Sequence, residues 1–338
     1  MSVNYAKAGV DLSKHREMHK IALKTIEEVA EKLGAKLGGI SGFAPHVLLG
    51  GSELALHVDG VGTKTIILQK LGALEVAGWD CIAMNVNDLA CGGFKTIAIS
   101  DYIAIGESNP ILFEQVMKGL AKAALYVKAP IISGETAILP GLLNGVDVVC
   151  FAIGVKHAQI PGVAGEGDVV VGVESWGLHA NGFSLVRKII EEKIGRYDAV
   201  IDGLDLAREL TKPTAIYHDL VLEAGKRGLI SSATHVTGGG WSKAKRALGE
   251  NLDMVLKPPR PPRIFEFLSS IGGVSIDEMY RVFNMGIGLI LTTRPENLEH
   301  LVQLIHQMGF NPHVLGRVVP GSGLIHLEVE EYGVKIQI

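Results

Sequence analysis

An acid, two glycines and a lysine follow one another within a few residues in the stretch Leu54–Lys64. Its apolar part, Leu54–Val58, predicts a short buried strand. The small and polar residues that come next are Asp59, Gly60, Gly62, Thr63 and Lys64. A carboxylate is a hard oxygen ligand for Mg²⁺, glycine lets a ligand approach the backbone, and lysine supplies a compact positive charge. The stretch therefore indicates phosphate and metal chemistry; the alternative that stays open is a tight turn with a surface lysine.

Two stricter glycine motifs are excluded for this stretch. In a P-loop the Gly-Lys pair is followed by Ser or Thr, whereas here Thr63 precedes Lys64. The dinucleotide fingerprint needs a third glycine where this chain has Thr65. A phosphate bound here would therefore be held differently from the phosphates of those two motifs.

A second group of polar residues interrupts an otherwise apolar helix, predicted over Gly78–Cys91. Asn85, Asn87 and Asp88 are its polar positions. A solvated face is the common reading of such residues, but a helix that is apolar on nearly all other positions is typical of a buried one. Because buried polar groups need partners, we expect Asn87 and Asp88 to face a site.

Further acids belong to predicted strands. Asp101 lies in the middle of the strand predicted over Thr96–Ile105, where an acid is costly unless it is paired or bound to metal. A shorter strand, Pro130–Ser133, is expected to end just before Gly134-Glu135-Thr136. This again places an acid and a hydroxyl at a strand end.

Glycine loops before helices mark the second half of the chain. The predicted strand Asp168–Val173 leads through the loop Ser175–Gly182, which contains His179 and Asn181, into a helix over Phe183–Lys193. A loop that enters a helix offers free backbone N–H groups to anions. The histidine could serve as acid, base or phosphate contact, although a lone loop histidine is more often a polar surface residue.

A similar loop runs from His235 to Gly240 and precedes a helix predicted over Trp241–Leu248. Thr237, Gly238, Gly239 and Gly240 make it the better phosphate cradle, because three consecutive glycines are rarer than one.

The remaining segments predict two α/β domains with strands and helices in alternation. Gly162–Gly167 is expected to link them, and Leu37–Pro45 is either a lid over a ligand or an ordinary loop. Predicted helices are Lys20–Leu33, Pro110–Tyr126 and Asn297–Met308; predicted strands are Val146–Val155, Glu278–Ile290, His313–Val319 and Leu324–Val329.

Composition fits a globular chain that can bury a large core. It has 338 residues, of which 47% are hydrophobic and 20% charged, and a net charge of −4. The absence of a basic excess gives no indication of a nucleic-acid partner. Glycine is frequent, with 42 of the 338 residues, against about 7% in typical proteins. This frequency favours several tight loops near a ligand, and a turn-rich fold would explain it too.

Cysteine usage and hydropathy predict a cytoplasmic enzyme or binding protein. Cys81, Cys91 and Cys150 show no CxxC spacing and cannot all pair, which favours buried free thiols in a reducing compartment. The first residues are polar rather than an apolar leader, and no run approaches the length of a membrane span.

Taken in order, the motifs resemble those of one family, phosphoribosylformylglycinamidine cyclo-ligase, also called aminoimidazole ribonucleotide synthetase. They cover almost the whole chain, and together they are far more specific than any one alone. The motifs are Ala8-Gly9-Val10-Asp11, Asp59-Gly60-Val61-Gly62-Thr63-Lys64, Val86-Asn87-Asp88-Leu89, Gly134-Glu135-Thr136-Ala137 with Pro140-Gly141, His179-Ala180-Asn181-Gly182-Phe183-Ser184-Leu185-Val186-Arg187-Lys188, Thr237-Gly238-Gly239-Gly240 and Glu278-Met279-Tyr280-Arg281-Val282-Phe283-Asn284-Met285-Gly286.

The resemblance implies an α/β (α+β) fold of two domains. The N-terminal domain, residues 1–158, would bind ATP and Mg²⁺ and pair its mixed sheet with that of a second subunit in a barrel-like homodimer core. The C-terminal α/β domain, residues 159–338, would complete the site. The family closes formylglycinamidine ribonucleotide to aminoimidazole ribonucleotide at the expense of ATP, through a phosphorylated amide.

The resemblance also implies roles for individual residues. The expected Mg²⁺ ligands are Asp59, Asp88 and Glu135, with Asn87 beside them. The expected ATP contacts are Gly60, Gly62, Thr63, Lys64, Gly134 and Thr136. The ribonucleotide would be bound by Ser175, His179, Asn181, Thr237, Gly238, Gly239 and Gly240. Lys64, His179 and Asp101 are the catalytic candidates; Asp101 could instead hold Lys64 or a turn, and His179 could instead cap a helix.

Two departures and two rivals accompany this reading. Ile138 stands where bacterial members usually have an acid, which puts the metal ligands in question, and the glycine loop Leu37–Pro45 also differs. The rivals are another ATP-using kinase or synthetase of the superfamily and a non-catalytic subunit of the same fold. Within the first class, selenophosphate synthetase is disfavoured because its reactive cysteine lies near the N-terminus whereas the first cysteine here is Cys81, and the hydrogenase maturation protein because it carries a C-terminal cysteine tail. The second is disfavoured because the acids and Lys64 are all kept.

Overall fold

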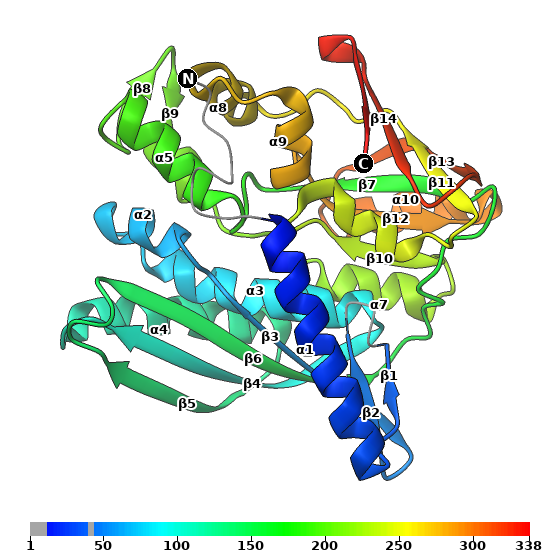
Figure 1. Ribbon diagram of the computed structural model, residues 1–338, viewed down its shortest axis with the longest axis horizontal. Helices are drawn as coiled ribbons and strands as arrows, with labels where there is room; N and C mark the ends of the chain where they lie inside the picture. The colour runs from blue at the N-terminus through cyan, green and yellow to red at the C-terminus, as the bar shows by residue number, and fades with distance from the viewer. Residues whose placement is uncertain (1–11, 40–43) are drawn as a thin grey trace.

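The computed structural model describes residues 12–39 and 44–338. The motif Ala8–Asp11 and part of the predicted lid, residues 40–43, lie outside the described residues. Two sheets dominate the chain, and Figure 1 shows them one above the other with helices between and behind them. Among the described helices none is long and apolar enough to cross a membrane.

The N-terminal sheet has six strands in the order β1-β2-β3-β6-β4-β5. Its pairings are antiparallel except β4 with β5, which is parallel. The strands are β1 (Leu37–Gly38), β2 (His46–Leu49), β3 (Ser52–Gly60), β4 (Phe94–Ile105), β5 (Ile131–Ile138) and β6 (Val146–Lys156). The predicted strands that begin at Leu54, Thr96 and Val146 are therefore confirmed, each slightly longer than expected. The burial expected for Leu54–Val58 is wrong, because only Ala55 in this run is buried.

One expected strand end is wrong. Gly134-Glu135-Thr136 lies inside β5, because its pairing with β4 continues to Ile105 opposite Ile138. The long partner strand β4 extends the ladder beyond the apolar run Pro130–Ser133 on which the prediction rested. In the same register Asp101 lies opposite Gly134.

Three helices belong to this half: α2 (Lys64–Lys70) and α3 (Glu75–Cys91) between β3 and β4, and α4 (Pro110–Val127) between β4 and β5. Figure 1 shows α3 and α4 on one face of the sheet. Asn109 caps α4 by accepting from the backbone N–H groups of Ile111 and Leu112. α3 and α4 pack closely at Gly119, where a Cβ would lie 1.8 Å from the Glu75 carbonyl oxygen. α3 is buried almost throughout, as its apolar composition predicts.

The C-terminal sheet has seven strands in the order β10-β12-β7-β13-β11-β14-β15. They are β7 (Val169–Glu174), β10 (Ser232–His235), β11 (Leu252–Leu256), β12 (Ile287–Thr293), β13 (Pro312–Pro320), β14 (Ile325–Val329) and β15 (Val334–Gln337). Its helices are α5 (Phe183–Lys193), α6 (Leu206–Leu210), α7 (His218–Lys226), α8 (Arg263–Gly272), α9 (Ile276–Val282) and α10 (Leu298–Gln307). A small hairpin, β8 (Val200–Ile201) with β9 (Leu204–Asp205), and short 3₁₀ turns complete this half. The helix Phe183–Lys193 is confirmed at both ends.

The strand predicted over Glu278–Ile290 is wrong in its first part and right from Ile287, where β12 begins. Its first part is the helix α9, whose N-cap Ser275 accepts from the Glu278 backbone N–H. A turn with positive φ at Met285 (51°) and Gly286 (96°) separates α9 from β12. The helix predicted over Trp241–Leu248 is instead the 3₁₀ helix η1, Gly240–Ala247.

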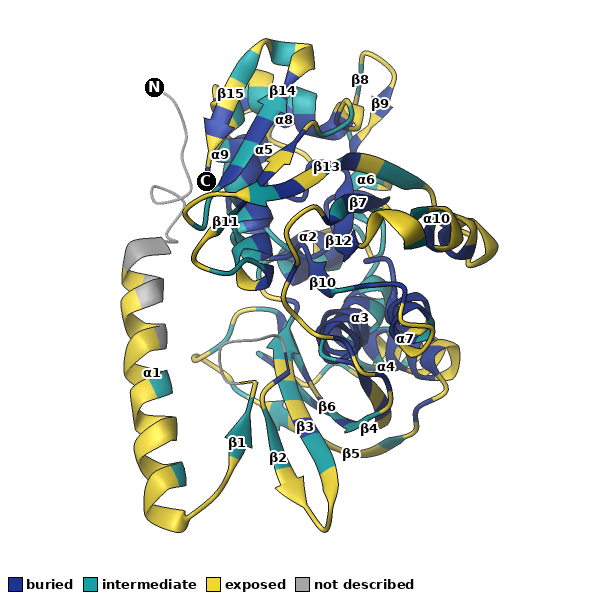
Figure 2. Cartoon of the chain, turned by 90° about the vertical axis from the view of Figure 1, so that its right-hand side faces the viewer, coloured by how far each residue is buried: buried dark blue, intermediate teal, exposed yellow. Residues whose placement is uncertain are grey.

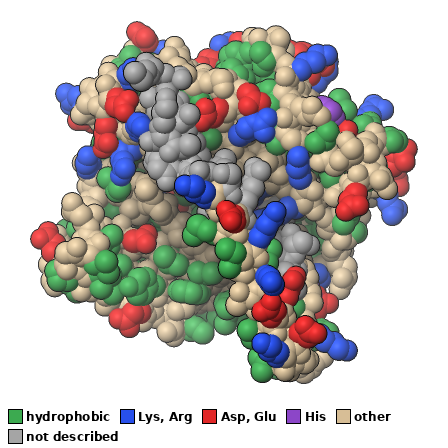
Figure 3. Space-filling view, in the orientation of Figure 1, with side chains coloured by type: hydrophobic (Ala, Val, Ile, Leu, Met, Phe, Trp, Pro, Cys, Tyr) green, Lys and Arg blue, Asp and Glu red, His purple; other side chains and the backbone are tan. Residues whose placement is uncertain are grey.

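The face of the N-terminal sheet opposite α3 and α4 is apolar and exposed. Leu56, Val58, Ile97 and Phe151 are 58%, 53%, 45% and 36% exposed, respectively. Figure 3 shows hydrophobic side chains gathered over this part of the molecule. Helix α1 (Leu12–Leu33) stands apart from the body on the same side, and almost all its described residues are exposed (Figure 2).

Candidate active site

Polar side chains of α3 bind the backbone of a segment from the C-terminal half. The carboxylate of Asp80 accepts from the Thr214 N–H at 2.6 Å, and the Trp79 indole donates to the Thr214 carbonyl at 2.8 Å. About two turns further on, Asn87 donates to the Ala215 carbonyl at 2.8 Å and accepts from the Tyr217 N–H at 2.7 Å. These bonds fix the two halves against each other along α3.

Lys64 belongs to this junction. Its side chain is fully buried, and its ammonium group donates to Asp80 at 2.6 Å, to the His179 carbonyl at 2.7 Å and to the Lys212 carbonyl at 2.8 Å. An ammonium has three N–H donors, so every donor of Lys64 is used. The lysine predicted to contact ATP phosphates is thus a buried link between the two halves.

His179 is buried beside this link. It adopts a left-handed backbone conformation with φ of 60°, which is uncommon for a non-glycine residue. Its Nε2 accepts from the backbone N–H groups of Trp176 and Ala215, both at 3.4 Å, while its Nδ1 has no partner among the described residues. Burial, with His235 and Lys64 nearby, holds the pKa of His179 well below its usual value. The imidazole is therefore neutral at physiological pH.

The richest polar cluster is built around Asp88, and we name it the Asp88 cluster: Asp88, His57, His235 and Lys243. Oδ1 of Asp88 accepts from Nδ1 of His235 at 2.8 Å. Oδ2 lies 3.4 Å from Nε2 of His57 and 3.9 Å from Nζ of Lys243. Burial raises the pKa of Asp88, but Lys243, His235 and His57 together hold it well below its usual range. A charged carboxylate thus sits where β3, α3 and the glycine loop meet.

The ring of His57 lies between Asn85 and Asp88. Asn85 donates to the Cys81 and Asp59 carbonyls, so its Oδ1 faces Nδ1 of His57, at 2.9 Å, and must accept. Nε2 points to the Asp88 carboxylate, which can only accept. This arrangement favours the protonated form of the ring. Burial lowers the pKa of His57, but Asp88 and Asn85 raise it by more, so the net shift of the pKa is upward.

Asp59 lies beside the same cluster. Burial and the charge of Asp88 raise its pKa, and the backbone N–H of Gly60 lowers it by donating at 2.8 Å. Two neighbouring carboxylates repel each other, and a bound cation relieves that repulsion. Mg²⁺ is commonly held by one or two carboxylates together with substrate phosphates, so Asp59 and Asp88 fit a magnesium ion that arrives with a nucleotide.

The other predicted acids lie elsewhere. Asp59, Cys150 and Asp101 are in register across β3, β6 and β4. A Cβ on Gly134 would lie 2.9 Å from the Asp101 carboxylate, so Gly134 continues this row. Because side chains alternate along a strand, the exposed Glu135 points to the opposite, open face. Within the described part of the chain, no three His, Cys, Asp or Glu side chains are grouped to hold a metal.

The wall opposite Asp88 comes from the glycine loop. Lys243, in η1, donates to the Thr237 hydroxyl, and Asn181 lies over Gly238, whose Cβ would be 3.2 Å from Oδ1 of Asn181. Gly239 and Gly240 have φ of 90° and 54°, so this turn needs residues without a Cβ. The predicted cradle Thr237–Gly240 therefore faces the Asp88 cluster.

The remaining predicted residues are divided between the junction of the two halves, the nearby loops and β5. Thr63 meets Ser184 across the two halves, with 3.0 Å between the hydroxyl oxygens. The Ser175 hydroxyl donates within its own loop, to Gly177 at 2.8 Å, and lies 3.1 Å from Oδ1 of Asn284. Gly62 has φ of 64° in the turn before α2, whereas the exposed Thr136 lies on β5 away from this wall.

Three members of the Asp88 cluster escaped the sequence analysis: His57, His235 and Lys243. His57 is two residues before Asp59 on the same strand, so strand alternation could have placed both on one face. Lys243 follows Thr237 by six residues, just after the glycine run. The contact of His235 with Asp88 spans 147 residues of sequence, and no local pattern announces it.

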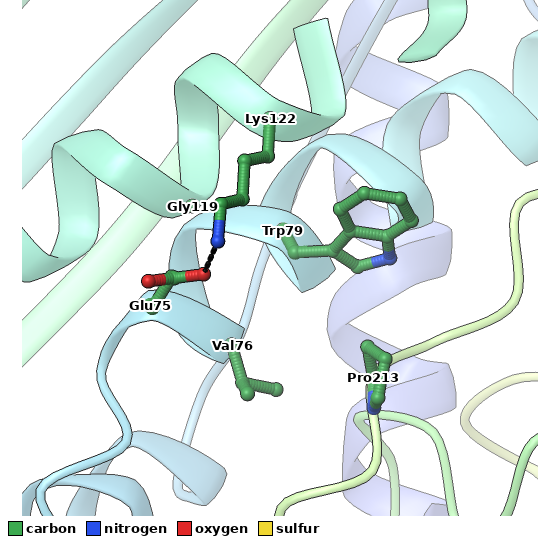
Figure 4. Close-up of a pocket in the computed structure, with 6 residues that line it drawn as sticks. All are labelled: Glu75, Val76, Trp79, Gly119, Lys122 and Pro213. Carbon is green, nitrogen blue, oxygen red and sulfur yellow. Dashed lines mark hydrogen bonds and ion pairs between the residues drawn. The ribbon is translucent and has the colours of Figure 1, made fainter.

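An open pocket on α3 and α4 is separate from this site (Figure 4). Its lining residues are Glu75, Val76, Trp79, Gly119, Lys122 and Pro213. Its charged side chains, Glu75 and Lys122, pair with each other. Neither the acids Asp59 and Asp88 nor the glycine loop borders it, so the cluster remains the candidate site.

Comparisons with known sequences match both halves of the chain. The family model described as AIR synthase related protein, N-terminal domain, matches residues 44–156, and the corresponding C-terminal domain matches residues 165–327. Curated proteins called phosphoribosylformylglycinamidine cyclo-ligase are 39% identical in Saccharolobus solfataricus, 38% in Pyrococcus furiosus and 35% in Bacillus licheniformis. These matches cover 96%, 98% and 96% of this chain and 96%, 99% and 98% of the respective relatives.

Solved structures of more distant proteins share the fold. A thiamine-monophosphate kinase from Stenotrophomonas maltophilia has a TM-score of 0.63 at 18% identity, over 88% of this chain and 92% of that one. Phosphoribosylformylglycinamidine synthase II from Thermotoga maritima has a TM-score of 0.60 at 16% identity, over 90% of this chain and 46% of that one. At such identities the likeness concerns the fold alone.

Proposed function

The chain belongs to the phosphoribosylformylglycinamidine cyclo-ligase family, and from this premise we propose that its Asp88 cluster and glycine loop form the site of ATP-dependent ring closure. The enzyme is a ligase of de novo purine biosynthesis, and its substrates are ATP and formylglycinamidine ribonucleotide. The observation that carries the site assignment is the meeting of two acids, a histidine, a lysine and a glycine turn between the two halves.

The reaction has two chemical steps. The formyl amide oxygen attacks the γ-phosphorus of ATP, the bond to the β-phosphate oxygen breaks, and ADP leaves. An amidine nitrogen of the same molecule then attacks the activated carbon. The carbon–oxygen bond breaks, the oxygen leaves within inorganic phosphate, and one proton is released. Because nucleophile and electrophile belong to one molecule, positioning supplies much of the acceleration.

The site's own residues would supply charge and position. Asp59 and Asp88 would hold Mg²⁺, which supplies charge neutralisation on the ATP phosphates when bound. Lys243 and His57 flank Asp88, and Lys243 would place positive charge near the transferred phosphoryl group. The backbone of Thr237–Gly240 and the Asn181 amide would bind the ribonucleotide phosphate.

Lys64 takes a different part in this proposal from that of a phosphate ligand. Its three donors already bind Asp80 and two carbonyl groups of the C-terminal half. We assign it to the junction that fixes the two halves of the chain relative to each other. The phosphate-facing lysine is then Lys243, which is partly exposed at the glycine loop.

The exposed apolar face of the N-terminal sheet supports a homodimer. Monomeric proteins rarely leave a large contiguous apolar face in water, and Leu56, Val58, Ile97 and Phe151 are exposed on neighbouring strands of one sheet. A second copy that brings the same face to this one would cover both. The cytoplasm is the proposed location, since the three cysteines are free and buried, as suits a reducing compartment.

A direct assay tests the proposal. Purified protein with formylglycinamidine ribonucleotide, ATP and Mg²⁺ is expected to form one aminoimidazole product for each ADP, and to form neither without Mg²⁺. Lys243→Met should lower kcat/KM by at least a hundredfold, because it removes a charge aimed at the phosphates. Lys245→Met, two residues further along η1, is the matched control and should change it less than threefold. Equal effects of the two variants would refute the assignment of Lys243.

A further inference from the structure

Helix α1 has an apolar stripe that its own chain leaves uncovered. Met18, Ile26, Val29 and Leu33 are 67%, 49%, 51% and 76% exposed. Among the described side chains of α1 only Leu23 and Ala30 are partly buried. The helix makes no extensive contact with another described helix or strand, and Figure 2 shows it standing off the body. Since most helices in proteins are stabilised by packing an amphipathic face, this one lacks its partner.

The spacing of the stripe fits a protein surface. Ala22, Ile26, Val29 and Leu33 recur at intervals of four, three and four residues, which places them along one narrow seam of the helix. A helix that lies on an anionic membrane carries mainly Lys and Arg on its polar face. Here the polar face also carries three acids on consecutive turns: Glu27, Glu28 and Glu31. The composition therefore favours a protein partner over a membrane.

The position of α1 identifies the partner. It lies on the same side of the molecule as the open apolar face of the N-terminal sheet (Figures 1 and 2). That face is the one paired with a second copy in the homodimer proposed above. A copy seated there would lie on the side of the molecule from which α1 projects.

We propose that the apolar seam of α1 packs against a second copy of the chain, so that each α1 is an arm that crosses the subunit boundary. This inference rests on the proposed homodimer. It assigns α1 to the intersubunit contact, which the pairing of the sheets alone does not require.

The test uses the full chain and two matched double variants. Ile26→Glu with Val29→Glu adds two negative charges on the seam, and Lys20→Gln with Lys24→Gln removes two positive charges from the polar face. The dimer dissociation constant is measured by sedimentation, and hydrogen exchange of the α1 amides is followed above and below it. The seam variant should weaken the dimer at least tenfold and abolish the protection of α1. The control should change the constant less than twofold.

Two other outcomes would refute the arm, and they differ in whether the homodimer is refuted with it. If the seam variant dimerises like the wild type and α1 exchanges equally fast in monomer and dimer, the arm is refuted and the sheet-mediated dimer stands. Loss of the dimer in Leu56→Glu would confirm that case. If the wild type is monomeric at every concentration but closes the ring at full rate, the homodimer and the arm both fall while the catalytic function stands.

A crosslinking experiment gives a second, independent readout. Ile26→Cys places one reactive thiol on the seam, because Cys81, Cys91 and Cys150 are buried. A second cysteine is added by Leu56→Cys or Val58→Cys, and a short bismaleimide should join the two introduced thiols across the subunit boundary. In mixed dimers of ¹⁴N and ¹⁵N chains, such a crosslink contains both isotopes. Crosslinks confined to single-isotope pairs would place α1 on its own subunit and refute the proposal.

Discussion

Replacing Lys64 by methionine tests whether this lysine links the two halves or binds phosphate. Lys64 and Asp80 are both fully buried, and their charged groups are 2.6 Å apart. Removing one member of a buried ion pair leaves the other charge uncompensated, at a cost of about 3–5 kcal/mol. The variant also leaves the His179 and Lys212 carbonyls without this donor. We therefore expect Lys64→Met to lower the free energy of unfolding by about 3–5 kcal/mol.

Urea unfolding followed by circular dichroism measures this change. Lys70→Met, on the same helix, is the control, because its pair with Glu191 is exposed and spans 3.5 Å; such surface pairs contribute about 0–1 kcal/mol. Adding Asp80→Asn to Lys64→Met should restore part of the loss, since the amide oxygen can still accept from Thr214 while the lone charge is gone. A Lys64→Met protein as stable as the wild type, with a raised KM for ATP, would refute the link and restore the phosphate role.

Three shorter predictions follow from other contacts. Gly119→Ala should cost about 1–3 kcal/mol of stability in a urea titration, because the new Cβ would meet the Glu75 carbonyl in the tight crossing of α3 and α4; stability within error of wild type would show that the helices separate freely. Burial raises the pKa of Asp253, but two backbone N–H groups and His326 lower it to about 2, from 3.8. This carboxylate therefore stabilises the fold above about pH 4 and loses that effect as the pH falls through 2, so Asp253→Asn should flatten the acid limb of a pH–stability curve; an unchanged limb would contradict the assignment. Asp88→Asn should abolish turnover while the circular dichroism spectrum stays native, and near-normal turnover would remove Asp88 from the site.

Elements with strong local signals were predictable from the sequence. The helix Phe183–Lys193 follows a glycine loop and has a clear apolar face, and its two ends agree with the structure. The strand that begins at Val146 is an apolar run bounded by turns, and it too was found. The segment Glu278–Ile290 is harder to assign, because an apolar run can be helix or strand. The N-cap at Ser275 makes its first part a helix.

The residue types of the candidate site were predictable from the sequence, but the burial and the long-range contacts of its side chains were not. Asp59, Asp88 and the loop from Thr237 were singled out because acids and glycines at strand ends and in an apolar helix are conspicuous. Lys64 looked like a phosphate ligand because a sequence does not show that Asp80, sixteen residues on, lies one hydrogen bond away. His235 could not be linked to Asp88 at all, since their contact depends on how the two halves pack.

The assignment of ring closure to this site is tested most directly by following one oxygen atom. Formylglycinamidine ribonucleotide labelled with ¹⁸O in the formyl amide is incubated with ATP, Mg²⁺ and the enzyme, and the inorganic phosphate is analysed by mass spectrometry. Phosphorylation of the amide oxygen predicts one ¹⁸O in each phosphate formed, with the yield falling in parallel with turnover in Lys243→Met but not in Lys245→Met. Unlabelled phosphate, with the ¹⁸O released as water while the imidazole forms, would contradict the proposed chemistry.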